Sequence, residues 1–333
     1  MALIWFAIAL VALIAIILLG PRASADIRPT FTPRSIGDDI EAYLTASEEA
    51  VAGIRDGLRK EIVWADPAHK SRTPIAIVCI HGFSASKGEL RPLPDKVAAA
   101  LGANLFFARL TGHAQDGPAL ARATVKDWIN DFAEAVAIGS RLGERVVIMA
   151  TSTGGALATI GALDPALSRA ITGLVLISPN YGVRGNGAWL LTQPWGGQLA
   201  NLIIGREYRF DPRSALHAKL WTTTYPTSAL LPMAALSNAA RRSPVESISI
   251  PALFVYSPRD QVVRPELTRA IVEKWGAAHE IVVVTDSDDP AQHVIAGEAL
   301  SPSTTDPLAL KIVDWIRRTD QPEDSGLASR ENR

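Results

Sequence analysis

The sequence predicts an α/β fold: a mostly parallel sheet flanked by helices, with a helical cap insertion and an N-terminal transmembrane helix. Short apolar runs alternate with amphipathic stretches over residues 60–318, and the alternation stops only between residues 181 and 246. This alternation is typical of a parallel sheet covered on both faces. An unbroken apolar run directly after Met1 predicts the N-terminal helix. A hydrophobic content of 48% is enough to fill one large core.

The N-terminal segment, residues 1–20, contains 18 consecutive apolar residues, 2–19. As a helix this run spans roughly 27 Å, close to the hydrocarbon thickness of a bilayer. It has no polar face to meet water, so we expect a membrane anchor made of a single helix. Basic residues that favour a cytoplasmic domain by the positive-inside rule follow the helix: Arg22, Arg28 and Arg34.

A cleaved export signal is the alternative interpretation of the same segment. Ala23-Ser24-Ala25 is typical of a signal-peptidase site, and the mature chain would then begin at Asp26 and be exported. The segment has no Lys or Arg before the apolar run, and that run is longer than the usual ~7 to 15 residues of a signal. These two features favour the anchor, and both interpretations stay open.

The elements that follow are assigned from hydrophobic periodicity. Residues 21–59 predict a linker and then a helix, because apolar residues recur at helical spacing from Ile40 to Ile54. Apolar runs predict seven strands, at 61–65, 75–81, 104–109, 145–150, 173–178, 252–257 and 280–285. Amphipathic stretches predict helices between them, at 89–101, 124–142, 153–163, 265–275 and 307–318.

Residues 181–246 form the predicted cap, in which tryptophans and leucines are scattered among helical patterns without a strand-like run. Its apolar residues include Ile203 and Ile204, and such a surface is expected to cover a hydrophobic acyl pocket. The tail, residues 319–333, is polar and lacks aromatic residues, which predicts disorder.

Charge and cysteine content exclude some classes of function. The net charge is −1, from 33 basic and 34 acidic residues without long blocks, so no nucleic-acid partner is expected. Cys79 is the single cysteine and cannot form an intramolecular disulfide. Its apolar neighbours indicate a small buried side chain, and the compartment stays open.

The strongest local motif surrounds Ser152. The apolar run 146–151 leads through this serine into Thr153-Gly154-Gly155, which is the strand–turn–helix context of a nucleophile elbow. Small residues are needed two positions before and after the serine, because strand and helix approach closely there. Those positions hold Ala150 and Gly154, and alanine stands where glycine is usual.

A serine nucleophile needs a base, since a free hydroxyl is protonated at neutral pH. His293 follows the last predicted strand, in a loop at the carboxyl end of the sheet. His81 and His113 are rivals that could equally hold loops by hydrogen bonds. The acid is expected after the penultimate strand, where Asp260 would orient the imidazole. Rival carboxylates closer to the histidine in sequence are Asp286, Asp288 and Asp289.

The order of serine, acid and histidine along the chain strengthens the assignment. Serine 152, aspartate 260 and histidine 293 each follow a predicted strand, and this order differs from that of trypsin-like and subtilisin-like enzymes. The tetrahedral oxyanion also needs backbone donors, each worth roughly 3 to 4 kcal/mol. The expected donors are the N–H groups of Phe83 and Thr153, with Gly82 allowing close approach.

These motifs resemble the α/β-hydrolase superfamily, and within it the carboxylesterase, monoacylglycerol lipase and lysophospholipase-like group. The matching residues are His81-Gly82-Phe83, the loop 109–113, the Ser152 elbow, Asp260 and His293, and the similarity covers about residues 61–318. The resemblance implies ester hydrolysis through an acyl-enzyme on a small-molecule ester or lipid of short to medium acyl chain, with monoacylglycerols and lysophospholipids as candidates. It implies no cofactor and no metal.

Two other classes of function stay open on the same fold. A peptidase or thioesterase is one, and a peptidase acting on amino termini would need an acid in the cap, for which Glu207 and Asp211 are candidates. A binding protein with a vestigial triad is the other, and Ala150 is its support. Labelling by a fluorophosphonate separates an activated serine from an inert one.

Overall fold

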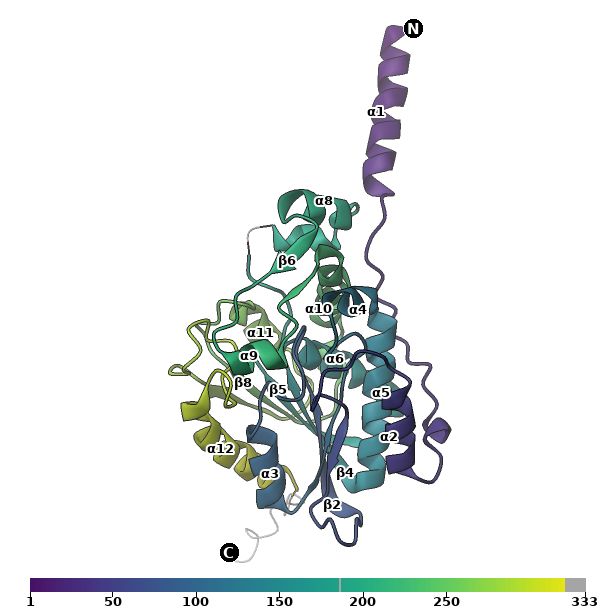
Figure 1. Cartoon of the computed structure of the whole chain (residues 1–333). Helices are drawn as coiled ribbons and strands as arrows, with labels where there is room; N and C mark the ends of the chain where they lie inside the picture. Colours follow the sequence, from purple (N-terminus) through teal and green to yellow (C-terminus); the bar gives the residue numbers. More distant parts are fainter. Residues whose placement is uncertain (186, 321–333) are drawn as a thin grey trace, which may run out of the picture.

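A seven-stranded sheet lies at the centre of the computed structural model, which describes residues 1–185 and 187–320 (Figure 1). The strand order is β1-β3-β2-β4-β5-β8-β9. All neighbouring strands are parallel except β1 and β3, which are antiparallel. The strands are β1 (Glu61–Val63), β2 (Thr73–Ile80), β3 (Asn104–Phe107), β4 (Gly143–Thr151), β5 (Ile171–Ile177), β8 (Ala252–Tyr256) and β9 (His279–Val283). The prediction of a mostly parallel sheet at these seven places is confirmed.

Both faces of the sheet are buried, which explains why its strands are near-continuous apolar runs. In β2, Val78 and Ile80 point to one core cluster, while Ile77 and Cys79 point to the other. The first cluster contains side chains of α5 (Val125–Leu142), α6 (Thr153–Gly161), α10 (Leu230–Arg242) and α11 (Pro265–Val272). The second contains side chains of α3 (Leu93–Leu101) and α12 (Pro302–Asp320).

Local sequence sets the helix ends. Thr124 and Asp127 form a capping box at the start of α5, in which each side chain accepts a hydrogen bond from the other's backbone N–H. α3 ends at Gly102, whose φ of 60° is left-handed and suits glycine. The shorter helices outside the cap are η1 (Pro33–Ile36), α2 (Ile40–Glu49), α4 (Gly117–Arg122), α7 (Pro165–Ser168) and η4 (Val245–Ser247).

The cap segment differs from its prediction because it contains strands. β6 (Glu207–Arg209) and β7 (Thr224–Pro226) form a separate antiparallel pair. Three residues are too few to show the alternation that identifies a strand in sequence. The last cap helix, α10, packs against α6 in the main core, whereas α8 and β6 lie above it (Figure 1). The other cap elements are η2 (Ala188–Thr192), α8 (Gly196–Ile203), α9 (Ala215–Leu220) and η3 (Thr227–Ala229).

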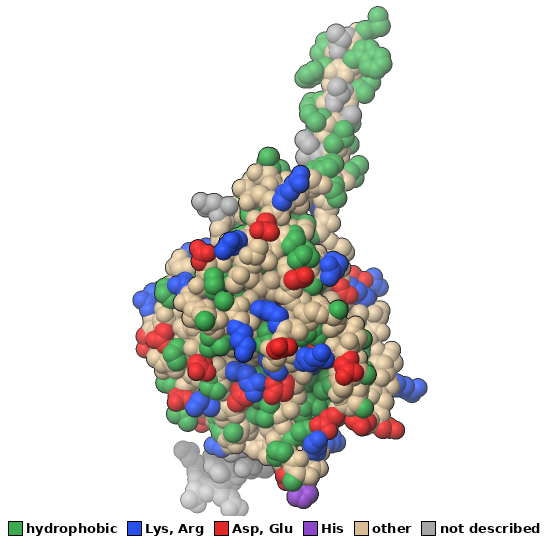
Figure 2. All heavy atoms as spheres, viewed as in Figure 1, with side chains coloured by type: hydrophobic (Ala, Val, Ile, Leu, Met, Phe, Trp, Pro, Cys, Tyr) green, Lys and Arg blue, Asp and Glu red, His purple; other side chains and the backbone are tan. Residues whose placement is uncertain are grey.

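The N-terminal apolar run forms α1 (Ala2–Leu18), which projects away from the rest of the molecule (Figures 1 and 2). The helix has 17 residues, which corresponds to about 26 Å against a hydrocarbon core of about 30 Å. Among the described residues, no helix combines the length and the apolar character needed to cross a bilayer. The predicted transmembrane anchor is therefore not supported, while the alternative of a cleaved signal stays a prediction.

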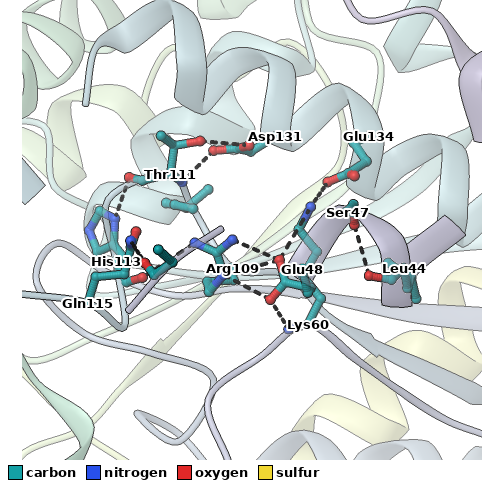
Figure 3. A network of polar contacts seen from close by, with 12 residues as sticks. Leu44, Ser47, Glu48, Lys60, Arg109, Thr111, His113, Gln115, Asp131 and Glu134 are labelled. Atoms are coloured by element: carbon teal, nitrogen blue, oxygen red, sulfur yellow. Dashed lines mark hydrogen bonds and ion pairs between the residues drawn. The ribbon is translucent and has the colours of Figure 1, made fainter. Parts of the chain in front are cut away.

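The segment between α1 and β1 packs on the domain that contains the sheet. Asn130 of α5 accepts hydrogen bonds from the backbone N–H groups of Thr30 and Phe31 at 2.7 and 3.0 Å. Helix α2 ends in a buried ion cluster (Figure 3), where Glu48 accepts two bonds from Arg109 at 2.7 and 2.9 Å. Lys60 links this pair to Glu134, at 2.5 Å. The predicted linker and helix are thus tied to the domain by charge pairs.

The predicted disordered tail, residues 319–333, lies outside the described residues from 321 onward. Its first two residues belong to α12, which ends at Asp320 and begins at Pro302, five residues before the predicted start. Pro307 therefore lies inside the helix.

Candidate active site

Ser152 occupies the turn between β4 and α6 in a strained backbone conformation, with φ 51° and ψ −115°. Its backbone N–H donates to the carbonyl oxygen of Ile177, at 2.9 Å, which fixes the turn against β5. A Cβ at Gly154 would lie 2.6 Å from the carbonyl oxygens of Ile80 and His81, so only glycine fits there. Ala150, in contrast, is fully buried in the core, and its methyl group is accommodated.

The structure brings the three residues of the predicted triad together. His293 Nε2 lies 3.0 Å from Ser152 Oγ, and His293 Nδ1 lies 2.7 Å from Asp260 Oδ2. In the neutral imidazole, Nδ1–H donates to the carboxylate and Nε2 accepts from the serine hydroxyl. This is the arrangement that a general base requires.

Asp260 is held rigidly in the loop after β8. The side chain is 1% exposed, and its Oδ1 accepts the backbone N–H groups of Val262 and Val263 at 2.7 and 2.8 Å. The other oxygen, Oδ2, is thereby left to face His293. Asp260 thus lies in the loop after β8 and contacts His293, and its role as the acid stays a prediction.

The rival carboxylates hold other groups. Asp289 Oδ2 accepts the backbone N–H groups of His293 and Val294, at 3.0 and 3.1 Å, so it shapes the loop that carries the imidazole. Asp288 accepts the N–H of Ser303, at 2.8 Å. Ser178 donates its hydroxyl to the carbonyl oxygen of His293, at 2.7 Å, which fixes the loop from the other side.

Three carboxylates influence the charge of His293. Burial would lower the pKa of this imidazole, but Asp260, Glu89 and Asp289 outweigh it, and the net pKa is raised above its ordinary value of 6.5. A base with a raised pKa accepts a proton more readily. It is also protonated over a wider acid range, so it is available as a base only at higher pH.

His81 and His113 hold loops instead of facing the serine. His81 Nε2 accepts the N–H of Leu110 at 3.1 Å, so Nδ1 carries the proton and donates to the carbonyl oxygen of Gly82, at 2.9 Å. Burial lowers the pKa of His81 to about 4. His113 is fully buried, and burial lowers its pKa as well. Both histidines therefore stay neutral near pH 7.

A cavity of about 660 Å³ opens at Ser152. Phe83 and Thr153, the expected oxyanion donors, line it beside the serine and His293. Aromatic side chains contributed by the cap form much of its apolar wall: Tyr208, Phe210, Trp221 and Tyr225. From the sequence we expect the apolar residues of the cap, its tryptophans included, to cover a pocket. Tyr208 and Phe210 were not singled out, because β6 is too short to be recognised as a strand. A second apolar cavity of about 370 Å³, lined by Ile203 and Ile204, adjoins it across Tyr208 and Tyr225.

The remaining predicted candidates lie at the rim or elsewhere. Asp211 lines the main cavity, together with Arg213, whereas Glu207 does not line it. In the part of the chain that the structure describes, no group of three or more His, Cys, Asp or Glu side chains could hold a metal ion.

Glu89 is a buried acid of this site that sequence reasoning missed. It lines the cavity, is 3% exposed, and accepts the N–H of Gly82 at 2.6 Å. Nothing in the run 86–91 distinguishes it from a surface glutamate, because its burial depends on how the loop after β2 folds over Ser152.

Comparison with known proteins agrees with this geometry. A thermostable monoacylglycerol lipase from Bacillus sp. (strain H-257) is 26% identical over 204 residues, which cover 60% of this chain and 76% of the relative. A structure reported with the metagenome-derived lipolytic enzymes LipS and LipT superposes with a TM-score of 0.64 at 19% identity, over 80% of this chain and 99% of the other. A soluble variant of monoglyceride lipase from Saccharomyces cerevisiae gives a TM-score of 0.59 at 12% identity, over 80% and 92%.

A family model places the chain more firmly than these individual relatives. The model described as "Alpha/beta hydrolase family" matches residues 77–298. That range includes the loop at His81-Gly82-Phe83, the turn at Ser152, Asp260 and His293, and it covers more than half of the chain. The resemblance read from the motifs is thereby confirmed, and the chain belongs to the α/β-hydrolase family.

Proposed function

We propose that this protein is a serine hydrolase of the lipase and esterase type, which cleaves carboxylic esters through an acyl-enzyme. The observation that carries the proposal is the pair of contacts made by His293, 3.0 Å from Ser152 Oγ and 2.7 Å from Asp260 Oδ2. A monoacylglycerol lipase among the relatives supports an ester as the substrate. A vestigial triad is disfavoured because the serine, histidine and carboxylate are buried and lie within hydrogen-bond distance of one another.

The proposed reaction begins with the attack of Ser152 Oγ on the ester carbonyl carbon. His293 Nε2 takes the hydroxyl proton and then gives it to the leaving alkoxide, while Asp260 stabilises the imidazolium. The N–H groups of Phe83 and Thr153 receive the oxyanion of the tetrahedral intermediate. Water, activated by the same histidine, then releases the carboxylic acid and frees the serine.

The cavity supports an apolar acyl group as the substrate's larger part. Its wall carries Phe210, Trp221, Tyr225 and Val262, and the adjoining apolar cavity extends it under the cap. Each buried methylene contributes roughly 0.8 kcal/mol at best. We therefore expect kcat/KM to rise by a few-fold per carbon from acetyl toward octanoyl p-nitrophenyl esters. A flat or falling series would refute the acyl-pocket assignment without touching the triad.

The test of the proposal is ester hydrolysis by the Ser152→Ala variant. The change removes one hydroxyl from the elbow, so we expect turnover to vanish while the thermal midpoint stays nearly unchanged. Retention of more than about a tenth of the wild-type rate would refute the nucleophile, since loss of a triad member costs several powers of ten.

A further inference from the structure

A buried carboxylate, that of Glu89, accepts a hydrogen bond from the loop that carries the expected oxyanion donor. Gly82 precedes Phe83, and its backbone N–H donates to Glu89 Oε2 at 2.6 Å. A Cβ at Gly82 would lie 2.9 Å from Glu89 Oε1 and 3.1 Å from the Cβ of Ser152. The glutamate, the glycine and the serine therefore converge on one point beside the cavity. A short hydrogen bond from a backbone N–H to a carboxylate is stronger than one to a neutral acceptor.

Glu89 also lies between the oxyanion loop and the segment that follows the catalytic histidine. A Cβ at Gly297 would lie 2.6 Å from the carbonyl oxygen of Glu89, which shows how closely the two segments pack. The next residue, Glu298, donates its backbone N–H to the carbonyl oxygen of Arg91, at 2.8 Å. The segment 86–91 thus packs against both the loop at Gly82 and the segment that follows His293.

The charged groups around Glu89 leave its carboxylate without a cationic partner among the described residues. Lys87 and Arg91 on the same segment are engaged by Glu61 and Asp95. His81, beside Gly82, is neutral near pH 7 because burial lowers its pKa to about 4. Burial raises the pKa of Glu89 to about 7, against the opposing effects of the Gly82 N–H and the charge of His293. The carboxylate in turn raises the pKa of His293, as do Asp260 and Asp289.

We propose that Glu89 is a positioning residue for ester hydrolysis: it holds the N–H of Gly82 so that the next N–H, that of Phe83, faces the oxyanion, and it links this loop electrostatically to His293. The proposal rests on the proposed function of Ser152 and His293. It assigns no contact between Glu89 and the substrate. The residue acts through the loop and through the imidazole.

Two substitutions separate these effects. Glu89→Ala removes both the acceptor and the charge, whereas Glu89→Gln keeps an oxygen that can accept the Gly82 N–H and removes only the charge. Glu298→Gln is the matched control, because Glu298 is an exposed glutamate close by in the structure that does not line the active-site cavity. All three are compared with wild type in p-nitrophenyl butyrate hydrolysis from pH 5.5 to 9.

For Glu89→Ala we expect kcat to fall by about 10- to 100-fold with KM little changed, because a displaced oxyanion donor affects the transition state more than the bound ester. For Glu89→Gln we expect kcat within about 3-fold of wild type at the alkaline plateau, because the amide oxygen replaces the acceptor. Its acid limb should move to lower pH, since one negative charge near His293 is gone. Glu298→Gln should match wild type in both respects.

The opposite results would overturn the proposal. Wild-type kcat for Glu89→Ala across the pH range would exclude the positioning role, and so would a Glu89→Gln variant as impaired as Glu89→Ala. An unmoved acid limb in Glu89→Gln would exclude the link to His293, and this readout decides even if Glu89→Ala does not fold. Ser152→Ala is measured alongside. If it retains turnover, the proposed function fails, whereas an inactive Ser152→Ala with a fully active Glu89→Ala refutes the role of Glu89 alone.

Discussion

Two buried glutamates, Glu48 and Glu89, behave in opposite ways although their exposed fractions are only 2% and 3%. Burial alone raises the pKa of each. At Glu48 the two bonds from Arg109 and the charge of Lys60 outweigh burial, and its pKa is lowered. At Glu89 the Gly82 N–H and His293 do not outweigh burial, and its pKa is raised to about 7.

The two glutamates belong to two networks of different charge balance: Glu48 lies in a structural ion cluster, and Glu89 lies beside the proposed catalytic residues. In the ion cluster of Figure 3, two carboxylates meet two cations, Lys60 and Arg109, so the charges balance and the cluster fastens α2 to the domain. Around His293, three carboxylates act on one imidazole. Among the described residues, the one Lys or Arg that pairs with these carboxylates is Arg213, which lies 3.6 Å from Asp289 and is 44% exposed. Unbalanced charge of this kind is what shifts a pKa toward a catalytic use.

The largest expected effect is the loss of activity when a residue of the proposed triad is replaced. His293→Ala should lower kcat/KM by about 10⁴-fold or more, and Asp260→Asn by about 10³- to 10⁴-fold, because the first removes the base and the second disturbs its tautomer. Asp286→Asn serves as the control and should stay close to wild type. A crippled Asp286→Asn together with a fully active Asp260→Asn would mean that the wrong acid has been chosen.

Breaking the ion cluster at Glu48 should lower the stability of the protein and leave its ester hydrolysis intact. Glu48→Gln leaves Arg109 buried without its counter-ion, so the free energy of unfolding at pH 7 should drop by about 3 to 5 kcal/mol. Because the folded pKa of Glu48 is lowered, its contribution is present above the ordinary pKa near 4.5 and is lost as pH falls through the folded pKa. Urea titrations at pH 7 and pH 4 measure this. Equal stability of variant and wild type at pH 7 would contradict the balanced cluster.

A smaller effect of the opposite sign is expected for Glu89→Gln. Because the folded pKa of Glu89 is raised from 4.5 to about 7, burying its charge costs stability that grows as pH rises between those two values. The amide has no such cost, so the variant should be more stable than wild type by about 1 to 3 kcal/mol at pH 8 and equal to it near pH 4. A Glu89→Gln variant that is less stable than wild type at pH 8 would show that favourable interactions of the Glu89 carboxylate outweigh the cost of burying its charge.

The sheet and the triad could be predicted from the sequence because each depends on local pattern. The central strands β2, β4, β5 and β8 are apolar runs that are largely buried, whereas the edge strands β1 and β9 are partly exposed. Ser152 directly follows β4, and Asp260 and His293 lie in the loops after β8 and β9. Seryl, aspartyl and histidyl side chains at the carboxyl ends of parallel strands meet at one edge whatever the loops between them do. The order along the chain therefore led to Ser152, Asp260 and His293, which the structure brings together.

Other features depend on contacts between distant segments, which no local pattern contains. Glu89 and Asp289 act on backbone N–H groups whose positions follow from loop folding. Asp289 is the more recoverable of the two, because an aspartate four residues before the histidine is typical of a side chain that bonds the following backbone. The cap was expected to cover an apolar pocket, but the sequence did not show that Tyr208 lies in its wall, because β6 and β7 have only three residues each. The anchor prediction depended on the length and the apolar character of the run, and the helix is one residue shorter than that run.

Labelling by a fluorophosphonate probe, followed by mass spectrometry of the modified peptide, tests most directly whether Ser152 is an activated nucleophile. Only a serine whose hydroxyl proton can be taken by a base reacts readily with such a probe. We expect one equivalent of label on Ser152 in the wild-type protein, much slower labelling of His293→Ala and none of Ser152→Ala. An unlabelled wild-type protein, or label on another serine that persists in Ser152→Ala, would contradict the assignment.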